Sequence, residues 1–169
     1  MRRLIEGLLR YSRIGKSGAF EPHDLNEILA DVMNDLAVFI RERGAEINFP
    51  VLPTIRCLQV EMTRLFQNFI SNALKFCPPE RTPVIDITAA EKDTHWEFTI
   101  SDNGIGIREE NLTKIFAMFQ KLHKEKIYKG YGIGLAFCEK IVELHGGTIS
   151  VKSVFGTGTS FTFTIAKRK

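Results

Sequence analysis

Strict alternation of apolar and polar residues over positions 95–100, with the sequence HWEFTI, restricts this 169-residue chain more than any other feature. A period of two places Trp96, Phe98 and Ile100 on one side of an extended strand. That apolar side needs a covering layer, and helices with an apolar stripe supply one. We therefore expect a half-buried strand in a sheet that is covered by helices.

The longest helical pattern begins at Asp24, which can cap a helix, while Glu27 completes a capping box. An apolar stripe then runs from Leu25 to Ile40, and Gly44 is a natural stop. This pattern predicts one helix that presents a single apolar face.

The remaining elements follow from the same two periodicities. Helices are expected over residues 60–76, ended by Cys77-Pro78-Pro79, over 132–145, and over a short segment marked by Leu112, Ile115, Phe116 and Phe119. Strands are expected around 47–49 and 84–89. A terminal hairpin is expected over 149–165, with its turn at Gly156-Thr157-Gly158. The polar segment 120–129 is expected to be a loop. With about five strands and no internal repeat, the chain is predicted to be a two-layer α/β fold.

The first 18 residues carry a separate signal. Leu4, Ile5, Leu8 and Leu9 recur at helical spacing, which predicts an amphipathic helix that ends before Gly18. We interpret it as the end of a truncated helical hairpin, and a terminal helix packed on its own domain is the alternative.

Charge and cysteine content limit the partners and the compartment. A net charge of +3, with scattered lysines and arginines, argues against a nucleic-acid partner. Cys57, Cys77 and Cys138 are far apart and show no CxxC spacing, so a reducing cytoplasm is the simpler location. No apolar run is long enough to span a membrane, so we expect no direct membrane contact from these residues.

A polar strip interrupts the helix predicted over residues 60–76. Asn68, Asn72 and Lys75 are spaced so that they share one helical face. Amide oxygens are hard ligands that suit Mg²⁺, and a lysine suits phosphate oxygens. A solvated helix face explains the same residues equally well.

Asp102 follows the alternating strand and precedes Gly104 and Gly106. Its carboxylate can accept a hydrogen bond from the amine of adenine, which guanine lacks at that position, so it would select ATP over GTP. For an isolated Asp-Asn-Gly, ordinary turn chemistry is the stronger explanation.

A second glycine cluster, Gly130, Gly132 and Gly134, precedes the last predicted helix. Backbone N–H groups there can approach phosphates without obstruction. The cluster is neither a Walker loop, which requires a following Gly-Lys-Ser/Thr, nor a dinucleotide fingerprint after a strand. By itself it is a weak signal.

Taken in order, these motifs resemble a known family. Asn-x-x-x-Asn-Ala-x-Lys-Phe, Asp-x-Gly-x-Gly-Ile, Phe-x-x-Phe, Gly-x-Gly-x-Gly-Leu and Gly-Thr-Gly-Thr are similar to the N, glycine and F boxes of sensor histidine kinases, which are GHKL ATPases. Segments 66–76 and 119–123 look most like the phytochrome-related branch. By this resemblance, residues 1–18 are the end of the second dimerisation helix with its linker, and residues 19–169 are the ATP-binding catalytic domain.

The resemblance implies a Bergerat-type sandwich, with a mixed sheet of about five strands and helices on one face, that binds ATP and Mg²⁺. For Mg²⁺ and the phosphates, the resemblance assigns Asn72 as the main Mg²⁺ ligand with Asn68 beside it, Lys75 as a phosphate contact, and Gly132, Gly134 and Leu135 as the phosphate cradle. For adenine, it assigns Asp102 as acceptor of the amine, Phe76 as a wall, Ile107 as lining of the pocket, Thr159 as closure of the adenine end, and Gly104 and Gly106 as points of close backbone approach. Residues 120–129 would be the ATP lid. His123 in that lid and Tyr131, which stands where the branch commonly has a small hydroxyl residue, are further candidate contacts.

The partners implied are a dimerisation domain carrying the phosphoacceptor histidine, expected upstream of Met1, and a response regulator. The segment His23-Asp24-Leu25 superficially resembles an acceptor segment, but Asp24 is better explained as a helix cap. His95 and His145 are expected to be solvated or capping residues. Two alternatives remain: an ATPase of the topoisomerase, mismatch-repair or chaperone type, and a non-catalytic ATP-binding module.

Overall fold

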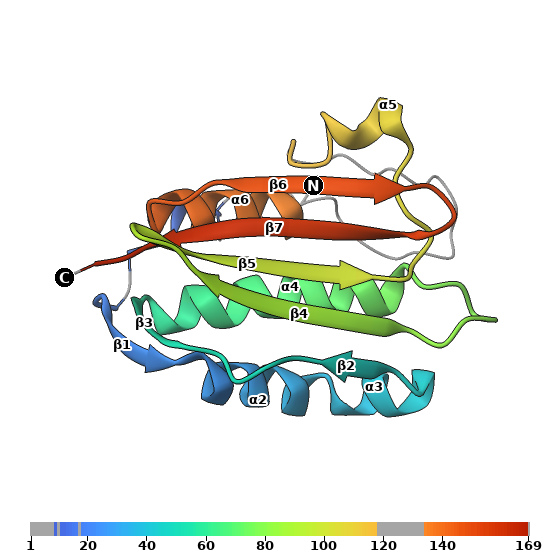
Figure 1. Ribbon diagram of the computed structural model, residues 1–169, viewed down its shortest axis with the longest axis horizontal. Helices are drawn as coiled ribbons and strands as arrows, with labels where there is room; N and C mark the ends of the chain where they lie inside the picture. The colour runs from blue at the N-terminus through green and yellow to red at the C-terminus, as the bar shows by residue number, and fades with distance from the viewer. Residues whose placement is uncertain (1–8, 10, 17, 118–133, 169) are drawn as a thin grey trace.

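The computed structural model describes residues 9, 11–16, 18–117 and 134–168. The main sheet has the strand order β2 (Glu46–Asn48), β4 (Val84–Glu91), β5 (His95–Asp102), β7 (Gly158–Ala166) and β6 (Ile149–Val154). β2 and β4 are parallel, and the other neighbours are antiparallel. Helices α4 (Gln59–Lys75) and α6 (Gly134–Leu144) lie behind this sheet, on one of its faces (Figure 1). The predicted two-layer α/β fold with a mixed five-stranded sheet is confirmed.

The predicted alternation divides the sheet into an apolar and a polar face. Phe98 of β5 lies opposite Phe163 of β7, and both side chains are fully buried. Their ring centroids are 5.3 Å apart, and Phe163 also stacks at 5.6 Å on Phe69 of α4. On the other face the hydroxyls of Thr99 and Thr162 lie 3.0 Å apart. The aromatic face therefore packs against the helices, as the sequence pattern requires.

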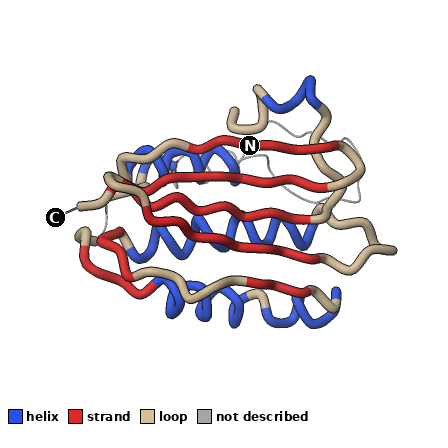
Figure 2. Tube along the Cα trace, in the orientation of Figure 1, coloured by secondary structure: helices blue, strands red, loops and turns tan. Residues whose placement is uncertain are grey.

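The apolar stripe after Asp24 forms two helices where one was predicted. α2 (Leu25–Asp35) and α3 (Ala37–Arg43) are separated at Leu36, whose φ of −97° and ψ of 5° leave the helical region. Both helices run along one border of the molecule (Figure 2). Beyond the break, Phe39 and Ile40 of α3 pack partly buried against the core. Gly44 ends α3 at a φ of 60°, as predicted.

The cap of α2 also differs from the prediction. The side chain of Asp24 accepts from the backbone N–H of Asn26 at 2.8 Å, where a capping box would use Glu27. The amide of Asn26 in turn donates to Leu52 O and accepts from Leu52 N. The residue that Asp24 caps is thus also bonded to a segment 26 residues away in the sequence.

A small antiparallel sheet, β1 (Glu21–Asp24) with β3 (Thr54–Cys57), was not predicted. β1 is polar and contains Pro22, which suits only an edge strand. The strand expected near positions 47–49 is shifted, because Ile47 pairs with Ile85 in β2 while Phe49 lies beyond it and is 42% exposed.

The other elements fall close to their predicted positions. α4 ends at Lys75, α5 (Glu109–Leu112) is shorter than the predicted segment, and α6 ends before His145. The predicted loop at 120–129 lies outside the described residues. Within the described part of the chain, every helix is too short or too polar to cross a bilayer.

The described end of the N-terminal segment contacts α4 and α6. The Tyr11 ring meets Phe137 of α6 edge-on at 5.7 Å, and Ile14 joins the core. The backbone N–H of Gly15 donates to Oε1 of Glu61 in α4 at 3.3 Å. A domain boundary after residue 18 stays a prediction.

Candidate nucleotide-binding site

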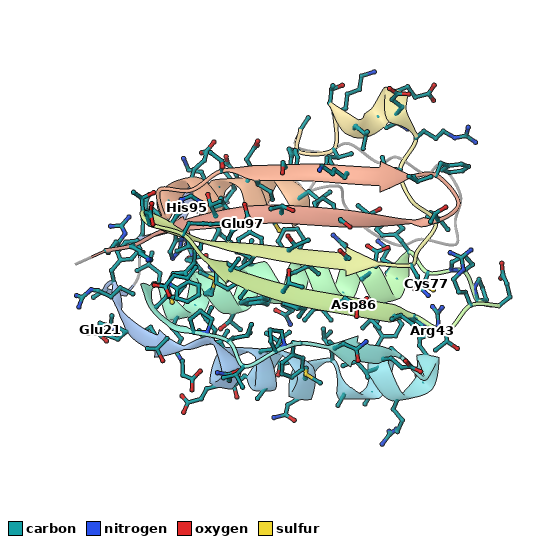
Figure 3. The ribbon with its side chains drawn as sticks, viewed as in Figure 1. Glu21, Arg43, Cys77, Asp86, His95 and Glu97 are labelled. Atoms are coloured by element: carbon teal, nitrogen blue, oxygen red, sulfur yellow. The ribbon has the colours of Figure 1, made fainter. Side chains whose placement is uncertain are left out.

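Asp102 is placed by the sheet register at the carboxyl end of β5. It lies opposite Ile85 of β4 on one side and Thr159 of β7 on the other. The turn that follows β5 therefore lies next to the hairpin between β6 and β7. The same end of the molecule holds the loop after α4, where Figure 3 shows Cys77 and Arg43 together.

The polar face of α4 is half-buried. Asn68 and Asn72 have intermediate exposure, whereas the intervening Phe69 and Ile70 are buried. A Cβ atom added to Gly134 would lie 3.2 Å from Oδ1 of Asn68. The first residue of α6 therefore packs directly against the amide of Asn68. This contact shows that the polar face of α4 is partly covered by α6 at Asn68.

The end of α4 joins the glycine turn. The carbonyl of Phe76, the C-cap residue, accepts from the backbone N–H of Ile105 at 2.9 Å. The ammonium of Lys75 lies 4.6 Å from the centroid of the Phe76 ring. A Cβ atom on Gly104 would lie 2.8 Å from Phe76 O and from Oδ1 of Asp102. Only glycine fits between them without a shift of the neighbouring atoms.

The carboxylate of Asp102 is held by its own turn. The backbone N–H of Gly104 donates to Oδ1 at 2.8 Å. Burial raises the pKa of Asp102, and the N–H groups of Gly104 and Thr159 oppose that shift. A partly desolvated acceptor of this kind favours a ligand that carries a hydrogen-bond donor.

Gly106 and Ile107 continue the turn along the β6–β7 hairpin. Gly106 has a φ of 69°, and a Cβ atom there would overlap the carbonyl of Val154. The N–H of Ile107 donates to Oγ of Ser153 at 2.8 Å, and this hydroxyl lies 2.9 Å from Oγ1 of Thr159. Thr159 is 7% exposed.

Ser153 was not predicted as a site residue. It links Ile107 to Thr159 and also donates to the carbonyl of Gly158 at 2.8 Å. Because Ser153 then uses its only proton, Thr159 must donate to Ser153, which leaves the lone pairs of Thr159 Oγ1 as acceptors. The signal in the sequence is only a polar residue on the inward side of β6.

The second glycine cluster is described only in part. His123, Tyr131 and Gly132 lie outside the described residues. Gly134 begins α6 beside Asn68, and Leu135 packs partly buried against the core. The described residues thus join Asn68, the end of α4, the Asp102 turn and Thr159 into one region.

His145 was expected to be a solvated or capping residue: it is not solvated, but its ring does bond a carbonyl in the last turn of α6. Its side chain is fully buried, its Nδ1 lies 2.7 Å from Ile141 O, and its Nε2 accepts from Leu58 N at 3.1 Å. A tautomer with the proton on Nδ1 satisfies both contacts. The fully buried Glu61, also not predicted, bonds to Gly15 and Arg64. These residues are structural and lie outside the Asp102 turn.

Residues 57–169 match the family model described as "Histidine kinase-, DNA gyrase B-, and HSP90-like ATPase". The match covers more than half of the sequence, and the chain belongs to this ATPase family. Similar proteins in it include a phytochrome and a sensory kinase. Cyanobacterial phytochrome A of Nostoc sp. is 40% identical over 166 residues, which are 98% of this chain and 22% of that protein. The adaptive-response sensory kinase SasA of Prochlorococcus marinus is 37% identical over 169 residues, covering 96% of this chain and 45% of the kinase.

Solved structures of histidine kinases have a similar fold. The nucleotide-free catalytic domain of the histidine kinase ThkA gives a TM-score of 0.75 at 26% identity, covering 89% of this chain and 97% of that domain. Full-length ShkA in complex with AMPPNP gives a TM-score of 0.77 at 27% identity, covering 98% of this chain and 36% of ShkA. The chain is a histidine-kinase ATPase domain related to phytochromes and SasA, and it spans less than half the length of these curated relatives.

Proposed function

We propose that this chain binds Mg-ATP and donates the γ-phosphate to a histidine on a dimerisation domain, in two-component signalling. The observation that carries the proposal is the desolvated carboxylate of Asp102 on a turn bonded to the end of the Asn68, Asn72 and Lys75 helix. Such a turn sets a base-reading group and a phosphate-reading group at a fixed separation. Phosphoryl transfer depends mainly on such positioning and on charge neutralisation.

The base half of the site is built from the Asp102 turn and the hairpin. Asp102 accepts from the adenine amine, and Thr159 offers a second acceptor beside it. The close approach of Gly104 and Gly106 to neighbouring backbone leaves no room for other side chains. Phe76 and Ile107 supply apolar walls. Their partial burial fits the flat faces of a base.

The phosphate half belongs to α4 and the start of α6. Two amide oxygens, from Asn68 and Asn72, fit Mg²⁺, which takes few protein ligands when phosphates and water provide the rest. When bound, the ion would neutralise charge on the phosphate oxygens. Lys75 adds a positive charge at the last turn of α4, and Gly134 lets backbone come close to Asn68. His123, Tyr131 and Gly132 are proposed to complete the phosphate contacts.

The acceptor histidine is proposed to belong to a partner domain. His23 lies on β1, at the opposite end of the molecule from the loop after α4, as Glu21 and Cys77 show in Figure 3. His145 is fully buried. We propose a dimerisation domain as the acceptor and a response regulator as the next carrier of the phosphate. The free thiols of Cys57 and Cys138, both buried, fit a cytoplasmic location.

A titration with a fluorescent ATP analogue and Mg²⁺ tests the binding step. Parent chain is expected to bind, while Asn72→Ala loses the Mg²⁺ dependence and Asp102→Asn loses preference for adenine. Asp86→Asn, on the polar face of β4, is the matched control and should bind like the parent. A folded parent chain that does not bind the analogue would contradict the proposal.

Transfer is tested with γ-labelled ATP and a separately supplied dimerisation domain. Acid-labile phosphate should appear on the added domain and not on this chain. Label on this chain that disappears in His23→Gln would instead identify His23 as the acceptor. Steady release of inorganic phosphate without any labelled protein would favour the ATPase alternative.

A further inference from the structure

Arg81 joins two segments that are distant in sequence. Its Nη1 donates to the carbonyls of Asn103 and Gly104, the latter at 3.1 Å, and its Nη2 donates to the carbonyl of Gly156 at 3.2 Å. The first two carbonyls belong to the turn after Asp102, and the third belongs to the tip of the β6–β7 hairpin. One guanidinium therefore holds both walls of the base half of the site.

Two further side chains, those of Asn103 and Cys77, contact the loop that carries Arg81. The side chain of Asn103 accepts from Val84 N at 2.9 Å and donates to Thr82 O at 2.9 Å. The thiol of Cys77 donates to the carbonyl of Arg81 at 3.4 Å. These contacts anchor the loop at Arg81 and just after it, so the guanidinium reaches the turn from an ordered backbone.

The planarity of the peptide bond transmits this contact to Asp102. In a trans peptide the carbonyl and the next N–H point in opposite directions, and no cis peptide occurs in the described residues. With the Asn103 carbonyl turned to Arg81, the N–H of Gly104 is directed to Oδ1 of Asp102. With the Gly104 carbonyl turned to Arg81, the N–H of Ile105 is directed to Phe76 O, at the end of α4.

We propose that Arg81 is a positioning residue for base recognition: it orients two successive peptide planes, and these planes hold the carboxylate of Asp102 and anchor its turn to α4. The inference rests on the proposed function. Arg81 itself is not expected to touch the nucleotide. It acts through Asp102, so its loss should affect the base contact more than the phosphate contacts.

The chemistry of the guanidinium explains why arginine is needed here. A planar fork with several fixed donors can serve three carbonyls at once, whereas the ammonium of lysine is a point charge on a flexible stem. Arg81→Lys therefore keeps the charge but not the simultaneous contacts. Arg81→Gln removes the charge and shortens the reach.

Arg43 provides a matched control. It also donates to three carbonyls, those of Leu74, Cys77 and Pro78, at 3.2, 3.0 and 3.1 Å. These carbonyls lie at the end of α4 and in the following loop, and none belongs to the Asp102 turn. Arg43→Gln thus removes an arginine with the same kind of contact near the site, without releasing the two peptide planes.

The experiment measures Mg-ATP and Mg-GTP affinities by competition for parent, Arg81→Gln, Arg81→Lys and Arg43→Gln, with the melting temperature of each. We expect Arg81→Gln to weaken ATP binding about tenfold, the effect of losing one charge-assisted hydrogen bond, and to lower the ratio of ATP to GTP affinity. Arg81→Lys should lie between parent and Arg81→Gln. Arg43→Gln should lower the melting temperature and leave the ratio unchanged.

Each other result overturns the inference. If Arg81→Gln keeps the parental ratio of ATP to GTP affinity, whether or not both affinities fall, Arg81 is only structural. If Arg81→Gln does not fold, an unchanged ratio in folded Arg81→Lys leads to the same conclusion. A folded parent chain that does not bind Mg-ATP overturns the proposed function and this inference together, whereas a parent that binds with an unaltered ratio in the variants overturns this inference alone.

Discussion

The N–H of Gly104 donates to Oδ1 of Asp102 at 2.8 Å, so the turn occupies part of the carboxylate that precedes it. A carboxylate has four acceptor positions, which is more than the N–H groups of Gly104 and Thr159 can use, so a base amine can still be accepted. Burial nevertheless raises the pKa of Asp102, so the ionised form costs free energy in the folded protein without ligand. The charge that would accept a base amine therefore also lowers the stability of the ligand-free fold.

Asp102→Asn should stabilise the ligand-free protein and weaken nucleotide selection. With a folded pKa above the unfolded value of 3.8, the folded chain binds more protons just above pH 3.8, so the carboxylate destabilises it most at higher pH. Removing the charge should raise the melting temperature at pH 7. The ATP preference over GTP should fall on the order of 100-fold or more. Asp86→Asn, on the polar sheet face, should change neither quantity.

Gly106→Ala and Gly44→Ala separate backbone strain from close approach. Both glycines have a positive φ, 69° and 60°, so each substitution carries a similar strain of about 1–2 kcal/mol. A Cβ atom on Gly44 meets nothing within 4 Å, whereas on Gly106 it overlaps Val154. In urea unfolding, Gly106→Ala should cost about 1–3 kcal/mol more. Equal losses would mean that the hairpin moves aside freely.

The buried strands and the main helices could be predicted from the sequence because each has its own periodic pattern of apolar residues. The alternation at Phe98 and Phe163 specifies a buried strand face because successive side chains point to opposite sides. The break at Leu36 and the β1–β3 pair were not predictable in this way. The β1–β3 pair joins distant segments, and the register of Pro22 opposite Arg56 leaves no periodic signal, while the apolar stripe runs through Leu36 without a Gly or Pro to mark the break.

The candidate site likewise contains residues with a signal in the local sequence and residues without one. Asn72, Asp102 and Gly104 could be proposed as site residues because their types, spacing and order together resemble the motifs of a known family. Arg81 and Ser153 were missed because they act through backbone groups of residues that fold next to them. For His145 the position before Gly-Gly indicated a helix end, where its ring does bond Ile141 O, but its full burial beside Phe20 and Leu58 had no signal in the local sequence.

Ser153→Ala should disturb the base half of the site, whereas Ser150→Ala should not. Ser153 accepts from Ile107 N and donates to Gly158 O, and its removal leaves the buried Thr159 hydroxyl without that partner. The expected cost is about 1–3 kcal/mol in urea unfolding, with weaker ATP binding. Ser150, exposed on the same strand, should change stability by less than about 0.5 kcal/mol. Equal effects would show that the hydroxyl link does not order the hairpin.

His145 should make the stability of the fold depend on pH. Burial lowers its pKa below 6.5, with the charge of Arg168 acting in the same direction, while the Ile141 carbonyl and Glu61 oppose the shift. Protonation of Nε2 would also place two N–H groups against each other at Leu58. The unfolded chain therefore binds a proton near pH 6.5 that the folded chain does not bind.

The sign follows from that difference in bound protons. Stability is fully present above pH 6.5, falls as the pH decreases from 6.5 toward the folded pKa, and levels off below it. The slope contributed by one group is at most about 1.4 kcal/mol per pH unit.

Urea unfolding at pH 7.5 and pH 5.5 should show this loss in the parent and in His95→Gln, whose ring is only half-buried. His145→Gln should be less stable at pH 7.5 but lose less on acidification, because its side chain does not titrate. If its loss between the two pH values equals that of the parent, His145 is not the group that titrates.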